Sequence, residues 1–123
     1  RGSYLRFIPN GLLILRAGGN SYFNMSSIQH LTSLERLILF SDGGIVKSDM
    51  KYINRLKNLK QLLISTVKLL PVSLYDISGL TNLRRLDFHG SHGFNSYHIK
   101  KYLGHIVGLK FFDNQISKLF SVS

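Results

Sequence analysis

Histidines near the C-terminal end of the chain are the side chains best suited to bind a metal ion. His89 and His92 are three residues apart in a glycine-rich stretch, and His98 and His105 are seven apart. A spacing of seven can bring two side chains onto one face of a helix. Zinc sites usually have more closely paired ligands, and only Asp87 adds a carboxylate, near His89. We therefore predict surface histidines, with no metal site and no bound cofactor.

Catalytic chemistry finds little support in the sequence. The six acidic residues are dispersed, so no carboxylate pair for acid–base catalysis is indicated. No phosphate-binding loop of the Gly-x-x-x-x-Gly-Lys type occurs. Ser91 lies near His89 and His92, but nothing supplies the oxyanion hole that a nucleophilic serine needs. The chain has no cysteine, which excludes thiol nucleophiles, thiolate metal sites and disulfides. We predict that the protein is not an enzyme.

The composition indicates a single folded domain with a large positive charge. Residues 1–123 are 44% hydrophobic, and 16 basic against six acidic residues give a net charge of +10. This charge favours acidic proteins, nucleic acids or anionic membranes as neighbours, but it is equally compatible with a basic surface that binds no charged ligand. No apolar run approaches the roughly 18 to 20 residues of a membrane span. With no cysteine, we expect the cytoplasm or another reducing intracellular compartment.

The elements that position these side chains repeat along the chain at intervals of 22 to 26 residues. Five triplets combine a step of three with a step of two, and the step of two is typical of a short strand. The triplets are Leu12, Leu15, Ala17; Leu34, Leu37, Leu39; Leu59, Leu62, Ile64; Leu83, Leu86, Phe88; and Leu109, Phe112, Asn114.

Between the triplets, apolar residues at steps of about three indicate short helical segments. They form three columns: Met25, Met50, Leu74, Ile99; Ile28, Ile53, Ile77 and then Tyr102 or Leu103; and Leu31, Leu56, Leu80, Ile106. Ser48-Asp49, Pro71 and Asn95-Ser96 supply start signals for three of these segments. We expect Tyr4 to Ile8 to be the tail of an earlier segment of this kind, and residues such as Ile116, Leu119 and Phe120 to form an irregular end.

Over almost the whole chain, the pattern resembles the leucine-rich repeat family. Leu34 to Leu39 and Leu83 to Phe88 match its Leu-x-x-Leu-x-Leu part, and Leu70-Pro71-x-x-Leu74-x-x-Ile77-x-x-Leu80-x-x-Leu83 resembles repeats of intracellular signalling proteins and plant immune receptors. The resemblance implies an α/β solenoid, a curved right-handed superhelix with about five short parallel strands on its concave face and short helices on its convex face. The chain is either a complete domain or a piece of a longer repeat protein.

One position departs from the family pattern. The motif asparagine falls at Asn20, Asp42, Val67, Ser91 and Ser117. A buried asparagine would bond loop backbone groups that otherwise stay unpaired, and Val67 cannot do so. We therefore expect an irregular connection after the third strand.

Side chains between the leucines are expected to point out of the concave face. They form three rows: Ile14, Arg36, Gln61, Arg85, Phe111; Arg16, Ile38, Leu63, Asp87, Asp113; and Gly18, Phe40, Ser65, His89, Gln115. Exposed apolar clusters with nearby arginines are typical of protein-binding surfaces. We predict a protein partner on Arg36, Ile38, Phe40, Leu63, Arg85 and Asp87. A terminal extension over the patch, or simply the strand preference of such residues, are the alternatives.

A second hypothesis concerns the convex face and a different class of partner. Basic residues crowd two helical segments and form a predicted basic ridge: Lys47, Lys51, Arg55, Lys57, Lys100 and Lys101. Tyrosines at 52, 75, 97 and 102 are interleaved, and aromatic rings stack on bases. This combination fits an RNA- or ribonucleoprotein-associated module, although a water-facing helix needs polar residues in any case. A third hypothesis is a segment of a larger immune-receptor-type repeat array.

Overall fold

The computed structural model describes residues 3–8, 11–17, 25–41, 47–69, 71–113 and 116–121. These residues form a seven-stranded sheet whose strands lie side by side in chain order. The strands are β1 (Ser3–Ile8), β2 (Leu12–Ala17), β3 (Arg36–Ser41), β4 (Gln61–Leu69), β5 (Arg85–His92), β6 (Lys110–Asp113) and β7 (Ile116–Ser121). The five strands from β2 to β6 run parallel, and β1 and β7 are antiparallel to their neighbours.

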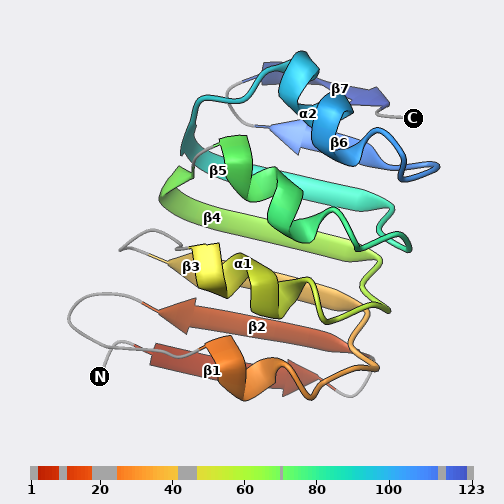
Figure 1. Ribbon diagram of the computed structural model, residues 1–123. Helices are drawn as coiled ribbons and strands as arrows, with labels where there is room; N and C mark the ends of the chain where they lie inside the picture. The colour runs from red at the N-terminus through yellow and green to blue at the C-terminus, as the bar shows by residue number, and fades with distance from the viewer. Residues whose placement is uncertain are drawn as a thin grey trace.

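Short helices connect the parallel strands and lie on one face of the sheet, as Figure 1 shows. They are η1 (Met25–Ile28), α1 (Lys47–Ile53), η2 (Pro71–Ile77) and α2 (Ser96–Leu103), of which η1 and η2 are 3₁₀ helices. Two of the three start signals fall as expected: Pro71 opens η2, and Asn95 is the N-cap of α2. Ser48 and Asp49 instead lie inside α1, which begins at Lys47. A parallel sheet with helices between its strands is an α/β arrangement, because parallel strands need crossover connections.

The core lies between the sheet and the helices and contains nearly all of the predicted apolar columns. Side chains that point inward from the middle strands are at most 3% exposed: Leu37, Leu39, Leu62, Ile64, Leu86 and Phe88. The helical columns are equally buried, except that Leu31 is only half-buried. The sequence left open whether Tyr102 or Leu103 continues the second helical column. Leu103 is fully buried, and Tyr102 packs at the margin of the core. The repeat period is therefore confirmed for the middle of the chain.

Successive units are also joined by hydrogen bonds at the turns that precede the strands. The carbonyl oxygen of Lys60 accepts from the backbone N–H groups of both Arg84 and Arg85. The side-chain amide of Asn58 donates to the Thr32 carbonyl oxygen at 2.7 Å, and that of Asn82 donates to Lys57 at 3.0 Å. Each unit therefore depends on its neighbour for polar bonds as well as for apolar contacts.

The expected register is wrong at the first strand. Leu13, and not Leu15, pairs with Leu37, and Leu13 is fully buried. The sequence here offers no alternation from which to choose a register, because residues 12 to 15 are all apolar.

The register is also wrong at the last parallel strand, by one residue. Phe111 and Asp113, expected to point outward, are buried, and Phe111 is paired with Leu86. The turn at Gly108, which has a positive φ of 80°, is one residue shorter than the turn before β5. Leu109 is therefore followed by an inward-pointing residue after two positions instead of three.

Both ends of the described sheet differ from the sequence-based expectation. Tyr4 to Ile8 lie in β1, a strand antiparallel to β2, and not in the tail of a helical segment. Ile116, Leu119 and Phe120 lie in β7, antiparallel to β6, and not in an irregular end. Each outer parallel strand is thereby covered by a hairpin partner, which occupies an edge that would otherwise be open for pairing.

An irregularity occurs after the predicted third strand segment, residues 59–64, but it lies inside β4, which continues as a strand to Leu69. The pairing of β4 with β5 shifts register between Ser65 and Lys68, at the position of Val67. The side chain of Val67 lies outside the described residues, as do those at the other four motif-asparagine positions, 20, 42, 91 and 117.

Candidate functional site

The sheet face opposite the helices carries side chains in rows that run across the strands. Strand register places Leu12, Arg36, Gln61, Arg85 and Lys110 in a first row, and Ile14, Ile38, Leu63, Asp87 and Phe112 in a second. Phe40, Ser65 and His89 follow in a third row. All six residues predicted to bind a partner lie on this face, and in the middle strands each occupies its expected row.

A small pocket lies in the middle of this face. Its volume is about 110 Å³, and its lining includes five of the six predicted residues. Leu12 and Gln61 complete the outward-facing lining, so the pocket spans β2 to β5. Ile38 and Leu63 are half-buried neighbours on adjacent strands and supply its apolar middle. Phe40 does not line the pocket and lies one row further along β3.

Arg85 is held in place by two neighbours at one side of the pocket. Its Nε donates to both carboxylate oxygens of Asp87, at 2.9 and 3.2 Å. Its guanidinium carbon lies 3.8 Å from the centre of the Phe112 ring, so the charge also stacks on an aromatic face. The Asp87 side chain is 13% exposed and that of Arg85 is 47% exposed. The ion pair therefore largely neutralises this side of the pocket.

Arg36 lies at the other side of the pocket, two strands from Arg85, with Gln61 between them. It is half-buried, and none of the side chains that the structure describes forms an ion pair with it. The pocket thus combines an apolar middle, one paired arginine and one arginine whose charge is not matched by a described carboxylate. This arrangement suits a ligand that brings both apolar surface and negative charge.

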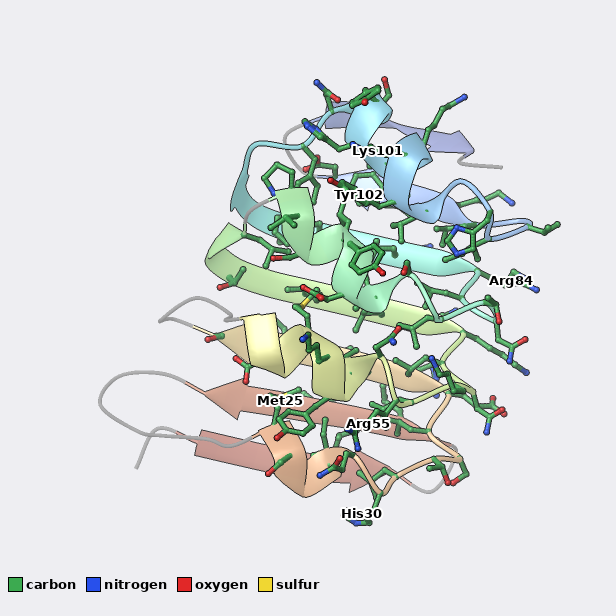
Figure 2. All side chains as sticks on the ribbon, viewed as in Figure 1. Met25, His30, Arg55, Arg84, Lys101 and Tyr102 are labelled. Carbon is green, nitrogen blue, oxygen red and sulfur yellow. The ribbon has the colours of Figure 1, made fainter. Side chains whose placement is uncertain are left out.

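The residues of the predicted basic ridge lie on the helix-bearing face but in two separate groups. Figure 2 shows Arg55 near α1 and Lys101 on α2, at different levels of the molecule. Between these helices lies η2, which contains no basic residue. Lys51, Lys57 and Lys100 are exposed, and the side chain of Lys47 lies outside the described residues. The ridge is therefore interrupted.

Part of the predicted ridge is engaged within the protein. The Arg55 Nη1 donates to the Gln29 side chain at 2.8 Å, and its guanidinium carbon lies 5.8 Å from the centre of the Tyr52 ring. The Lys57 Nζ donates to the carbonyl oxygen of Gly79 at 3.4 Å. These two side chains contribute to contacts between neighbouring units, which reduces their freedom to bind phosphates.

A cluster of tyrosines surrounds Lys101 at the C-terminal half of the same face. The ammonium nitrogen of Lys101 lies 5.8 Å from the ring centre of Tyr97 and 5.4 Å from that of Tyr102. The Tyr102 ring meets Tyr75 edge-on, with 6.4 Å between the centres. Tyr75 and Tyr97 are 61% and 64% exposed. Of the four tyrosines that the sequence interleaves with basic residues, three lie in this cluster, and Tyr52 lies beside Arg55 on α1.

Two of the histidines considered as metal ligands have structural hydrogen bonds. His98 takes part in the N-terminal cap of α2, where its Nδ1 accepts from the Asn95 N–H at 3.1 Å. The His105 Nε2 lies 2.7 Å from the carbonyl oxygen of Ser78 in the preceding unit. Among the described residues, no group of three or more histidine or carboxylate side chains is arranged to hold a metal ion. Across all described residues of the chain, no helix is both long enough and apolar enough to span a membrane.

Three outward-facing residues of the site were absent from the predicted binding set. Leu12 was assigned to the core because the first register was wrong, and Phe112 because the last one was. Gln61 had been placed on the correct row but has neither charge nor apolar surface to single it out. Of these three, only Phe112, the ring on which Arg85 stacks, could have been found from the sequence. Considering both possible registers of Phe111-Phe112 would have placed it on the outward face.

Comparisons of this chain with protein-family models, with curated proteins and with solved structures find no match. The function is therefore inferred from the geometry of the sheet face and the helix face.

Proposed function

We propose that this chain is a leucine-rich repeat solenoid that acts as a non-catalytic protein-interaction module. Support for the architecture comes from the repeated strand–turn–helix units, whose inward leucines are buried against the next unit. In this proposal the partner binds the sheet face opposite the helices, which would be the concave face of the solenoid.

One observation carries the proposal. Ile38 and Leu63 are apolar neighbours on the water-facing side of the sheet, and a pocket opens over them between Arg36 and the Arg85–Asp87 pair. Apolar surface ringed by charged and hydrogen-bonding groups is the usual composition of a protein interface. The hairpin strands β1 and β7 lie at the two edges of the sheet, beside this row of side chains. No described helix covers the row.

The proposal is tested by capturing partners from cell extract with nuclease-treated and untreated samples of three proteins. These are the unmodified chain, Leu63→Ser on the sheet face and Lys101→Gln on the helix face. We expect a protein partner that survives nuclease, is lost with Leu63→Ser and is retained with Lys101→Gln. Retention of every partner by Leu63→Ser, with unchanged thermal unfolding, would contradict the proposal.

A second candidate function is nucleic-acid binding by the helix face. The specific observation in its favour is Lys101 between the Tyr97 and Tyr102 rings, beside the exposed Tyr75. Bases stack on such rings while lysines contact phosphates. Its signature is binding that weakens with salt, by roughly ten-fold between 50 and 200 mM for the two phosphate contacts that Lys100 and Lys101 could make. Binding of single-stranded RNA that is insensitive to salt, or to Lys101→Gln, would reject it.

A further inference from the structure

The pocket on the sheet face has the size and lining to take one branched aliphatic side chain. Its volume is about 110 Å³, compared with a dry cavity of roughly 150 Å³ that holds a benzene molecule. Leu12, Ile38 and Leu63 are all half-buried around it, so each still has apolar surface to lose to a ligand. A side chain inserted here would remove water from three apolar neighbours at once.

The charges around the pocket are asymmetric. Arg85 is neutralised by Asp87 at 2.9 Å and stacked on Phe112. Arg36 forms no ion pair with any side chain that the structure describes, and Gln61 between the two arginines is neutral. A ligand carboxylate is therefore attracted to Arg36 more strongly than to the side of the pocket where the charges of Arg85 and Asp87 cancel. A guanidinium can bind a carboxylate through two parallel hydrogen bonds.

The spacing between the apolar and charged groups matches an extended peptide. Arg36 and Ile38 are separated by two residues on β3, which corresponds to roughly 6.6 Å along a strand. In an extended ligand, side chains two residues apart point the same way and have the same separation. One side chain of such a ligand reaches the apolar middle of the pocket while the next but one reaches Arg36.

We infer that this pocket recognises an extended acidic peptide, in which an aliphatic side chain lies over Ile38 and Leu63 and a carboxylate two residues away binds Arg36. The inference rests on the proposed function, since it specifies what the partner presents to the sheet face. It adds the chemistry of the partner segment, an aliphatic-x-acidic pattern, and identifies Arg36 as the residue that selects for charge.

The test is a nuclear magnetic resonance titration of the full ¹⁵N-labelled chain. The probe is the blocked peptide acetyl-Gly-Ser-Leu-Ser-Glu-Ser-Gly-amide, with two matched peptides in which Glu is replaced by Gln or Leu by Ser. We expect shifts centred on the amides of β3 to β5 and affinity about ten-fold or more weaker for each matched peptide. Unchanged affinity after Glu→Gln, or no binding by any of the three peptides, would overturn the inference.

Two protein variants separate the specific contact from general charge attraction. Arg36→Gln is expected to weaken the acidic peptide by about ten-fold or more and to leave the Gln peptide unchanged. Lys51→Gln removes the same charge from the exposed surface of α1 and is expected to change neither. Equal weakening by both variants would show non-specific attraction and overturn the inference. So would an oligouridylate that displaces the peptide and depends on Arg36 to the same extent, since the site would then select phosphate.

The inference and the proposed function fail differently. If Arg36→Gln leaves capture of the cellular partner intact while Leu63→Ser abolishes it, the sheet face is the binding surface and the acidic-peptide inference is wrong. If Leu63→Ser also leaves capture intact, both are wrong.

Discussion

Two residues with unusual geometry, Thr66 and Gly90, meet at the register shift between the paired strands β4 and β5. Gly90 has a φ of 142°, and a Cβ atom added there would meet the carbonyl oxygen of Thr66. The hydroxyl of Thr66 is buried and has no hydrogen-bond partner among the described residues. Both positions lie next to the register shift that follows Ser65, so the bulge forces a close backbone approach and leaves a polar atom unsatisfied.

Gly90→Ala should therefore destabilise the protein by about 2 kcal/mol or more, because the new side chain meets backbone and the conformation disfavours any L side chain. Gly93→Ala is the matched control, since its Cβ would come no closer than 3.7 Å, to Pro71. It should change stability by less than about 1 kcal/mol. Urea unfolding followed by circular dichroism measures both, and equal stability of the two variants would contradict the bulge geometry.

Thr66→Val should raise the free energy of unfolding by about 1 kcal/mol, because it removes a buried hydroxyl that gains no hydrogen bond on folding. Thr66→Ser keeps the hydroxyl and loses the methyl group, so it should lower stability instead. The two substitutions change the free energy of unfolding in opposite directions only if the Thr66 hydroxyl has no hydrogen-bond partner. A lower urea midpoint for Thr66→Val would show that the hydroxyl has a partner.

At the scale of elements, α2 begins with a capping box in which histidine replaces the usual Glu or Gln. Asn95 Oδ1 accepts from the His98 N–H at 3.2 Å, and His98 Nδ1 accepts from the Asn95 N–H. The short helix also buries Ile99 and Leu103, so its position depends on the cap and on two core contacts. A seven- or eight-residue helix has too few internal hydrogen bonds to be stable without such support.

His98→Gln should therefore retain stability to within about 0.5 kcal/mol, because a glutamine at this position accepts the same backbone N–H. His98→Ala loses that acceptor and should lower stability. Asn95→Ala loses the side chain that accepts from the His98 N–H and should lower the free energy of unfolding by about 1 kcal/mol. Thermal unfolding of the three variants is the measurement. Identical melting temperatures for His98→Ala and the unmodified chain would mean that the second half of the box contributes nothing.

Side-chain hydrogen bonds from two asparagines join successive units of the repeat. Asn58 and Asn82 occupy the same place in successive units, and each donates to a carbonyl oxygen of the unit before it. At the next equivalent position, Gly108 has no side chain, and the Thr81 carbonyl oxygen accepts from the Nη1 of Arg84, a residue of its own unit, at 3.0 Å. The asparagine bonds between units therefore do not extend to the unit of Gly108.

At the scale of the whole molecule, stability comes from one core that is shared by all units. Leu62 lies at its centre on β4 and is 1% exposed. Leu62→Ala should cost about 2 to 5 kcal/mol, the range for a fully buried leucine. Since a single domain of this size has only about 5 to 15 kcal/mol of stability, we expect a large fall in the urea midpoint and unfolding in one step. An unchanged midpoint would mean that the strand register is wrong.

The sequence was sufficient for the middle of the fold and insufficient for its ends. Between residues 25 and 109, apolar residues spaced by two and three positions identify each inward leucine correctly. The spacing is informative there because one face of each element is buried and the other faces water. At Leu12 to Leu15 and at Phe111-Phe112, consecutive apolar residues leave the register undetermined. The antiparallel pairing of β1 and β7 depends on contacts with the neighbouring strands, which no local pattern encodes.

The candidate site could be predicted in part for the same reason. Arg36, Ile38, Leu63, Arg85 and Asp87 line one pocket because they lie on strands whose register was correct. The pairing of Arg85 with Asp87 and Phe112, which leaves the two arginines with different roles, depends on side-chain orientation. The sequence places the basic residues on two helical segments that are two repeats apart, and the segment between them, η2, contains no basic residue that would join the two groups.

Photo-crosslinking from each face in turn decides whether a protein binds the sheet face. A photoreactive phenylalanine analogue replaces Phe40 on β3 in one sample and the exposed Tyr75 on η2 in the other. We expect a nuclease-resistant protein adduct from position 40 and none from position 75. Adducts from position 75 alone, or adducts that disappear after nuclease treatment, would contradict it and favour the helix face as the binding surface.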